Sequence, residues 1–230
     1  RLITSAGYPA EISNQICDCL AEVAAATAYG QQLDVQNLRG EEAYWRVIHA
    51  KSTPFYAGAL KTGGMAAGGQ APQLAALAEF GTCIGEMIQL EDDLNDALQT
   101  PANADWGQGR NNLVILYART AEHPGRQRFV ELLTKIGANG ALEEAQQLLF
   151  TSGAVSYCAY LLVSRFGRAR RMLAQAQLPN AAVLAEILDQ YSASLLSLLR
   201  LSGIDLAPQF LESFQSAPAG DPPRSRPPSA

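Results

Sequence analysis

Two long stretches of the sequence, residues 73–100 and 125–178, contain no proline. Proline removes a backbone hydrogen bond and breaks a helix interior, so only stretches without it can form long helices. Alanine, leucine, glutamine, glutamate and arginine dominate the body of the chain, and the alternation typical of strands is nowhere sustained. We therefore predict an all-α protein, a bundle of long helices joined by short connections.

The apolar periodicity, together with the positions of proline and glycine, predicts where the helices begin and end. The predicted helices cover residues 9–33, 41–51, 53–68, 72–98, 111–121, 125–137, 141–176 and 180–201. Pro54 is expected to split the second of these from the third. Residues 1–205 are predicted to form one helical domain, and residues 206–230, rich in proline and serine, a disordered tail.

The composition excludes several classes of protein. Hydrophobic residues make up 48% and charged residues 17% of the chain, so it is not mostly disordered. The formal net charge of −5 argues against a nucleic-acid partner. No apolar run approaches the roughly 18 residues of a transmembrane segment. The four cysteines form no C-x-x-C motif and indicate free thiols in a reducing compartment, which favours a cytoplasmic location.

The most informative segment is QLEDDLND, residues 89–96. At 100° per residue, a helical arc of about 100° contains four polar side chains, Gln89, Asp92, Asp93 and Asp96. Carboxylates three and four residues apart repel by about 0.2–0.5 kcal/mol per pair, so the cluster does not stabilise the helix. Mg²⁺ would compensate this charge, because it binds through one or two carboxylates plus substrate phosphates. The alternative is a solvated acidic face on a surface helix.

Three further segments carry complementary groups. Residues 30–34, GQQLD, end the first long helix; Lys51 and Ser52 lie at the next helix break; and Gly109-Arg110 precedes a later apolar helix. Acidic metal ligands in one segment and cationic or hydroxyl groups in others are what a magnesium–diphosphate substrate requires.

The order and spacing of these motifs resemble the second half of a trans-isoprenyl diphosphate synthase, of the polyprenyl synthetase family. The motifs are G-Q-x-x-D, Y-x-x-x-x-x-x-K-[ST], G-x-x-x-G-x-x-x-Q-x-x-D-D-x-x-D and G-[KR], and the similarity covers about residues 10–200. The resemblance implies an all-α helical bundle of the isoprenoid synthase type, incomplete here, that acts as a homodimer. It also implies a Mg²⁺-dependent prenyltransferase in isoprenoid biosynthesis. An allylic isoprenyl diphosphate ionises, isopentenyl diphosphate attacks the allylic cation, and a proton is lost.

The resemblance also assigns roles to residues. Asp92, Asp93 and Asp96 match the second aspartate-rich motif and are the predicted metal ligands. Gln89 and Lys51 match residues beside the allylic diphosphate. With Asp92, these two are the predicted catalytic residues.

Two positions depart from the usual family residue. Ser52 stands where threonine is common, and Arg110 stands where lysine is common. Both are predicted to bind substrate together with Lys51 and Gln89, and a guanidinium can grip phosphate through two parallel hydrogen bonds. Gln31 and Asp34 match the G-Q-x-x-D pair and are assigned to support these residues.

The first aspartate-rich motif of the family has no counterpart in residues 1–29, and the loop 100–106 lacks an extra Gly-Lys. We therefore expect the 230 residues alone to be inactive and the activity to belong to a longer parent chain. Two alternatives stay open. One is a non-catalytic partner subunit of a heteromeric prenyl diphosphate synthase, and the other is a prenyltransferase of the same family that modifies peptides.

Weaker signals have simpler interpretations. His49 and His123 lie outside metal-ligand spacing and are predicted to be structural or exposed. Four arginines are expected to form a solvated helix end, where cations are favoured: Arg165, Arg168, Arg170 and Arg171.

Overall fold

A computed structural model describes residues 2–108 and 111–201, the side chains of residues 108 and 194–201 excepted. Within this part of the chain all regular structure is helical, which confirms the predicted all-α class. The helices are α1 (Leu2–Ser5), α2 (Ala10–Val35), α3 (Glu41–Lys51), α4 (Thr53–Ala66), α5 (Ala71–Leu98), α6 (Ala104–Gln108), α7 (Leu113–Thr120), α8 (Arg126–Leu133), α9 (Ala141–Thr151), α10 (Ala154–Gln175) and α11 (Ala181–Leu201).

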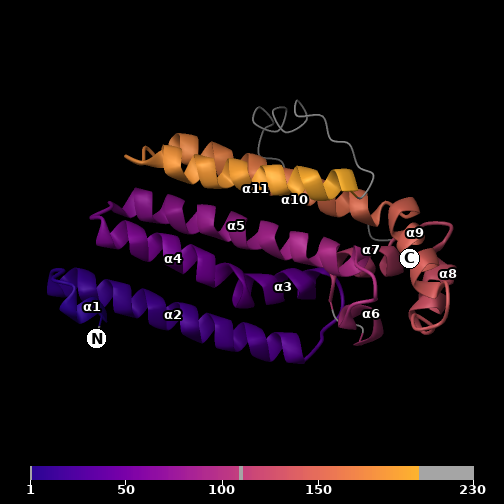
Figure 1. Ribbon diagram of the computed structural model, residues 1–230. Coiled ribbons are helices and arrows are strands. Elements are labelled where there is room, and N and C mark those ends of the chain that lie inside the picture. The colour runs from indigo at the N-terminus through magenta and orange to yellow at the C-terminus, as the bar shows by residue number, and fades with distance from the viewer. Residues whose placement is uncertain (1, 109–110, 202–230) are drawn as a thin grey trace, which may run out of the picture.

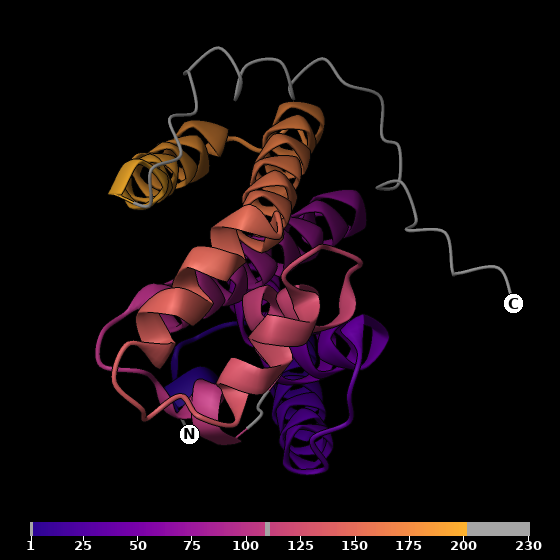
Figure 2. The same ribbon diagram turned by 90° about the vertical axis from the view of Figure 1, so that its right-hand side faces the viewer.

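The long helices lie in stacked layers (Figure 1). Helix α2 packs on α3 and α4, α4 packs on α5, and α5 packs on α10, which is followed by α11. The short helices α6–α9 gather at one end of this stack, the end that faces the viewer in Figure 2. Helix α5, which carries the acidic segment, therefore lies in the middle of the molecule.

Helices α4 and α5 approach each other closely because α5 has glycine at the contact points. A Cβ atom at Gly81 would lie 2.5 Å from the carbonyl oxygen of Tyr56, and one at Gly85 would lie 2.9 Å from Cα of Thr53. Real Cβ atoms do not come this close to backbone, so the G-x-x-x-G spacing is a packing requirement. This contact brings the acidic half of α5 beside the junction of α3 and α4.

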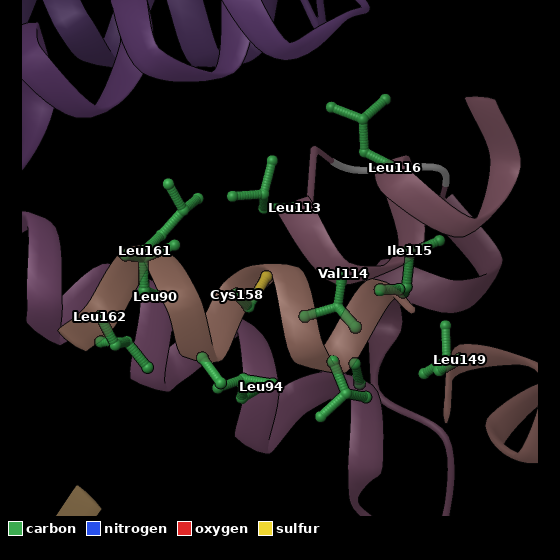
Figure 3. Packing of buried hydrophobic residues seen from close by; sticks show 14 of the residues in the cluster. Leu90, Leu94, Leu113, Val114, Ile115, Leu116, Leu149, Cys158, Leu161 and Leu162 are labelled. Atoms are coloured by element: carbon green, nitrogen blue, oxygen red, sulfur yellow. The ribbon is translucent and has the colours of Figure 1, made fainter. Parts of the chain in front are cut away.

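The main hydrophobic core lies on the other side of α5, where α5 meets α7 and α10 (Figure 3). Leu90 and Leu94 of α5, Val114 of α7, and Leu161 and Leu162 of α10 are almost completely buried. Burial of each such side chain stabilises the fold by about 1.5–3 kcal/mol. The core thus fixes one side of α5, while the opposite side packs on α4.

The long helices agree with the prediction except between residues 141 and 176, and the short helices α1 and α6 were not predicted. The single predicted helix is in fact two, α9 and α10, which are bent by 55° at their junction. Gly153 occupies this junction in the left-handed region, with φ of +81°. The expected break before Pro54 is confirmed, since α3 ends at Lys51 and α4 begins at Thr53. The predicted tail, residues 206–230, lies outside the described residues.

The arginine end of α10 is less solvated than predicted, because Arg168 is exposed whereas Arg165 and Arg170 are partly buried. Each of three arginines pairs with an acid on a neighbouring helix: Arg165 with Glu86, Arg168 with Glu79, and Arg170 with Asp189. A long α-helical arginine reaches across a packed interface while its aliphatic part covers apolar surface. These side chains therefore connect α10 to α5 and α11.

Two expectations from composition can be compared with the structure. All four cysteines are free, with Cys17 exposed and the other three buried. No helix in the described ranges is by itself long and apolar enough to span a membrane, and α9 and α10 pass that test only jointly, as a bent pair.

Candidate active site

A cleft of about 330 Å³ lies between α2, the α3–α4 junction and α5. The lining residues are Thr27, Lys51, Ser52, Phe55, Tyr56, Gly85, Ile88, Gln89 and Asp92. Charged and amide groups converge from α3 and α5, whereas aromatic and aliphatic groups come from α4 and α5. The structure thus brings together four of the predicted site residues, Lys51, Ser52, Gln89 and Asp92.

A larger groove, of about 500 Å³, lies between the first turns of α5 and the last turns of α10. Glutamine, alanine and proline make up most of its lining. The acid among its lining residues, Glu79, is already paired with Arg168. This groove offers no cation to an anionic ligand, so the smaller cleft is the candidate site.

Lys51 is the last residue of α3, and its Nζ atom lies 2.6 Å from Oδ2 of Asp34. The two helices meet closely because α2 has glycine one turn before Asp34. A Cβ atom at Gly30 would lie 2.4 Å from the backbone nitrogen of Lys51. The G-Q-x-x-D motif therefore combines a close helix contact with an anion that holds the lysine at the cleft.

A chain of hydrogen bonds leads from the cleft into the protein. The hydroxyl of Ser52 donates to Oε1 of Gln89 at 3.2 Å, and Nε2 of Gln89 donates to Oδ1 of Asp93 at 3.0 Å. Gln89 and Asp93 are four residues apart on α5, where side chains of one helix face meet. The chain connects a side chain that lines the cleft with a carboxylate that does not.

Asp93 is buried, with only 3% of its surface exposed. Its Oδ2 atom accepts a 2.7 Å hydrogen bond from the backbone N–H of Leu113, the first residue of α7. Burial raises the pKa of this carboxyl to about 7, although the hydrogen bonds from Leu113 and Gln89 act in the opposite direction. Asp93 thus contributes to the contact between α5 and α7.

Asp92 and Asp96 are the more accessible acids of the motif. Asp92 is exposed and lines the cleft, and Asp96 is half-buried and accepts a hydrogen bond from Gln99. Partial burial and then the charges of Asp96 and Glu91 raise the pKa of Asp92. The carboxylate of Asp92 therefore lies close to negative charge that its surroundings do not compensate, which is the condition a cation would relieve.

The aspartate-rich motif is divided between two sides of α5. An arc of about 100° is wide enough that Asp92 faces the cleft while Asp93 faces α7. Among the described residues, no three acidic, histidine or cysteine side chains come together in a group that could hold a metal ion. The contacts of Asp93 favour a structural role over its predicted role as a metal ligand.

Arg110 lies outside the described residues, so its predicted contact with substrate stays a prediction. The residues that follow it are well anchored. Nδ2 of Asn112 donates to the carbonyl oxygen of Asp93 at 2.7 Å, and Oδ1 accepts from the N–H groups of Val114 and Ile115. Asparagine is a favoured N-cap, and this one fixes the start of α7 to the acidic helix.

Sequence reasoning missed the buried Glu86. Its carboxylate accepts from Arg165 at 2.7 Å and lies 2.7 Å from Nε2 of His49. Burial alone would raise the pKa of Glu86, but the hydrogen bonds and charges of His49 and Arg165 hold it below its ordinary value. The sequence signal that could have revealed it is a glutamate among the apolar positions of α5. The contact agrees with the predicted structural role of His49.

The comparisons with known proteins are consistent with this arrangement. The family model of polyprenyl synthetase matches residues 2–149, well over half of the chain. The chain belongs to the polyprenyl synthetase family. A short chain isoprenyl diphosphate synthase from Methanothermobacter thermautotrophicus is 28% identical over 152 residues, which cover 63% of this chain and 45% of that protein. This polyprenyl synthetase chain spans about half of the length of the curated relatives it matches.

Solved structures of a polyprenyl synthase and a geranylgeranyl pyrophosphate synthase share the fold. A polyprenyl synthase from Roseobacter denitrificans matches with a TM-score of 0.67 and 25% identity, over 77% of this chain and 62% of that one. A geranylgeranyl pyrophosphate synthase from Corynebacterium glutamicum, complexed with calcium and isoprenyl diphosphate, matches with a TM-score of 0.68 and 22% identity. That match covers 77% of this chain and 59% of the other.

Proposed function

We propose that this polyprenyl synthetase chain supplies the diphosphate-binding side of a Mg²⁺-dependent prenyltransferase, which condenses isopentenyl diphosphate with an allylic isoprenyl diphosphate. The observation that carries the proposal is the convergence of Lys51, Ser52, Gln89 and Asp92 on one cleft. Because the chain spans about half of the length of its relatives, the activity is proposed for the complete enzyme.

Lys51 is the cationic group of the cleft and would pair with diphosphate oxygens. Its ammonium is held by Asp34, so its position is set before a ligand arrives. A preorganised cation stabilises the charge that grows on the leaving diphosphate without reorganising at the moment of reaction. The hydroxyl of Ser52, next in the chain, is a second donor at the same edge.

The remaining lining favours the isoprenoid part of a substrate. Phe55 and Tyr56 of α4 and Ile88 of α5 are apolar neighbours of the polar groups. An apolar wall excludes water, which would otherwise capture a carbocation. The cleft therefore combines a phosphate-binding edge with a surface that suits an allylic hydrocarbon.

Asp92 and Asp96 are the residues proposed to hold the divalent ion. Two accessible carboxylates one helical turn apart suit Mg²⁺, which binds through one or two carboxylates and keeps several waters. When bound, the ion would neutralise the diphosphate and orient it towards Lys51. The calcium and isoprenyl diphosphate complex of the Corynebacterium relative supports this ligand class.

The test is transfer of radiolabel from isopentenyl diphosphate to an allylic diphosphate by the full-length enzyme with Mg²⁺. Lys51→Ala and Asp92→Ala are expected to abolish most of the turnover. Matched controls are Lys135→Ala and Asp18→Ala, because both side chains are exposed and lie away from the cleft lining. Unchanged turnover in Lys51→Ala and Asp92→Ala would contradict the proposal.

The same assay separates the alternatives. A peptide-modifying enzyme would transfer the allylic group to a peptide and leave isopentenyl diphosphate unused, and a non-catalytic subunit would transfer neither. A homodimeric assembly and a cytoplasmic location stay predictions, to be checked by analytical ultracentrifugation and by cell fractionation.

A further inference from the structure

We infer that Asp93 is a positioning residue that sets which atom of the Gln89 side-chain amide faces the cleft, and that it does not bind the metal. The inference rests on the proposed function, because it concerns Gln89 as a group of that site. It starts from the two hydrogen bonds that Asp93 accepts, one from Gln89 and one from Leu113.

The polarity of the Gln89 amide follows from the chemistry of its partner. Nε2 of Gln89 donates to Oδ1 of Asp93 at 3.0 Å, so the carboxyl of Asp93 takes the donor end of the amide. The other end of the amide, Oε1, is then the end that Ser52 meets at the cleft. Gln89 consequently presents an acceptor oxygen at the cleft, and such an atom can stabilise positive charge on a ligand there.

Further contacts hold the Asp93 side chain in this orientation. Its Oδ2 atom accepts from the N–H of Leu113, and Asn112 donates to its carbonyl oxygen. The hydroxyl of Tyr44, buried and without a hydrogen-bond partner of good geometry, lies beside the same carboxylate. If Asp93 moved to reach a cation in the cleft, a buried N–H at the start of α7 would lose its partner, which is costly.

The neighbouring residue shows the contrast. Asp92 is exposed and lines the cleft, while Asp93 is 3% exposed and faces α7. Adjacent residues of one helix differ in direction by about 100°, so two consecutive aspartates can serve different purposes. The pair D-D is therefore one candidate metal ligand followed by one orienting group.

The first experiment measures Mg²⁺ binding by isothermal titration calorimetry, with inorganic pyrophosphate present, in the full-length protein. Asp92→Asn is expected to weaken this binding by about tenfold, which is 1.4 kcal/mol. Asp93→Asn is expected to leave it unchanged. If Asp93→Asn weakens the binding as much as Asp92→Asn does, Asp93 is a metal ligand and the inference is wrong.

The second experiment tests whether the side-chain amide of Gln89 turns over when its partner at position 93 is changed. With asparagine at position 93, an N–H₂ group can face Gln89, so the glutamine amide turns over and presents its donor to the cleft. Turnover by Asp93→Asn should fall by about 10–100-fold, with thermal stability retained. Adding Gln89→Glu restores an acceptor on both sides, so the double variant should turn over faster than Asp93→Asn alone. A double variant no faster than the single one overturns the inference.

A second route is available should Asp93→Asn fail to fold. Leu113→Pro deletes the N–H that donates to Asp93, together with the leucine side chain. Proline is tolerated there because Leu113 is the first residue of α7 and follows an extended residue, Asn112, with ψ of 125°. Leu113→Ala keeps that N–H and is the matched control for lost packing. Leu113→Pro should lower kcat more than Leu113→Ala does, with equal Mg²⁺–pyrophosphate binding. Equal kcat in both variants contradicts the inference. Wild-type protein that binds Mg²⁺ and pyrophosphate but transfers no prenyl group would count against the proposed function alone.

Discussion

The ammonium group of Lys51 lies 2.6 Å from Oδ2 of Asp34, and each side chain is a little over a third exposed, at 36% and 39%. A pair as exposed as this contributes about 0–1 kcal/mol to stability. Its importance is therefore the placement of a cation at the cleft, where Asp34 holds a flexible side chain in one position. The effect of Lys51 on ligand binding should then depend on Asp34.

A double-mutant cycle tests this dependence. Lys51→Ala should weaken binding of inorganic pyrophosphate with Mg²⁺ by about tenfold, or 1.4 kcal/mol. In an Asp34→Ala background the same change should cost clearly less, because the lysine is no longer held at the cleft. Calorimetric titration of the four proteins gives the coupling. Additive effects would show that Asp34 does not position Lys51.

Gly30 offers a test of the helix contact that supports this pair. Gly30→Ala places a Cβ atom 2.4 Å from the backbone nitrogen of Lys51, so α2 and α3 must separate. We expect a loss of about 1–3 kcal/mol in unfolding free energy, together with weaker pyrophosphate binding. Gly63→Ala is the control, since a Cβ atom there meets nothing within 4 Å, and alanine stabilises a helix interior by about 0.5–1 kcal/mol. Urea unfolding curves of both variants measure the difference.

Two acids on α5 should differ greatly in their contribution to stability. Glu86, whose side chain is 5% exposed, bonds to His49 and Arg165, whereas Glu79, 49% exposed, pairs with Arg168. Glu86→Gln should cost about 3 kcal/mol, because it leaves the partly buried cation of Arg165 without its counterion. Glu79→Gln should cost less than about 1 kcal/mol. Equal midpoints in urea for the two variants would disprove this ranking.

The stability of the protein should depend on pH with opposite contributions from two buried carboxyls. Burial raises the pKa of Asp93 from 3.8 to about 7, so between these values the folded state keeps a proton that the unfolded chain has lost. Its contribution therefore falls as the pH rises through this window. Glu86 has a lowered pKa, so its contribution is present above its unfolded pKa and is lost as the pH falls.

Unfolding free energies measured from about pH 2 to 7 should separate the two. Asp93→Asn removes a group that titrates in the folded protein, so its stability should decline less with rising pH than that of the wild type. The unfolding free energy of Glu86→Gln should instead fall less than that of the wild type as the pH is lowered. Parallel curves for the wild type and Asp93→Asn would be inconsistent with the raised pKa.

Most of the fold could be predicted because it follows from local signals. Proline-free apolar periodicity located the long helices, and Pro54 marked the break between α3 and α4. The break at Gly153 was missed because glycine is tolerated inside helices, and only its left-handed conformation shows that it ends one. The arginines of α10 were misread because their partners, such as Glu79, lie on a helix far away in the sequence.

The sequence predicted which residues belong to the site, but not the direction in which each side chain points. Motif spacing brought Lys51, Gln89 and Asp92 together, and the cleft contains all three. Spacing placed Asp93 on the same arc, yet its contacts come from α7, which no pattern within α5 reveals. Helical periodicity gives the direction in which a side chain leaves the helix axis. Only tertiary packing decides which neighbouring element the side chain meets in that direction.

The ion pairs of α10 imply a graded response to ionic strength along that helix. Arg165 is 18% exposed beside a buried acid, while Arg168 and Arg170, nearer the end of α10, are 49% and 36% exposed. Dissolved salt screens exposed charges far more than buried ones. High salt would therefore weaken the ion pairs that connect α11 and the last turns of α10 to their neighbours first, and leave the pair of Arg165 with Glu86 largely intact.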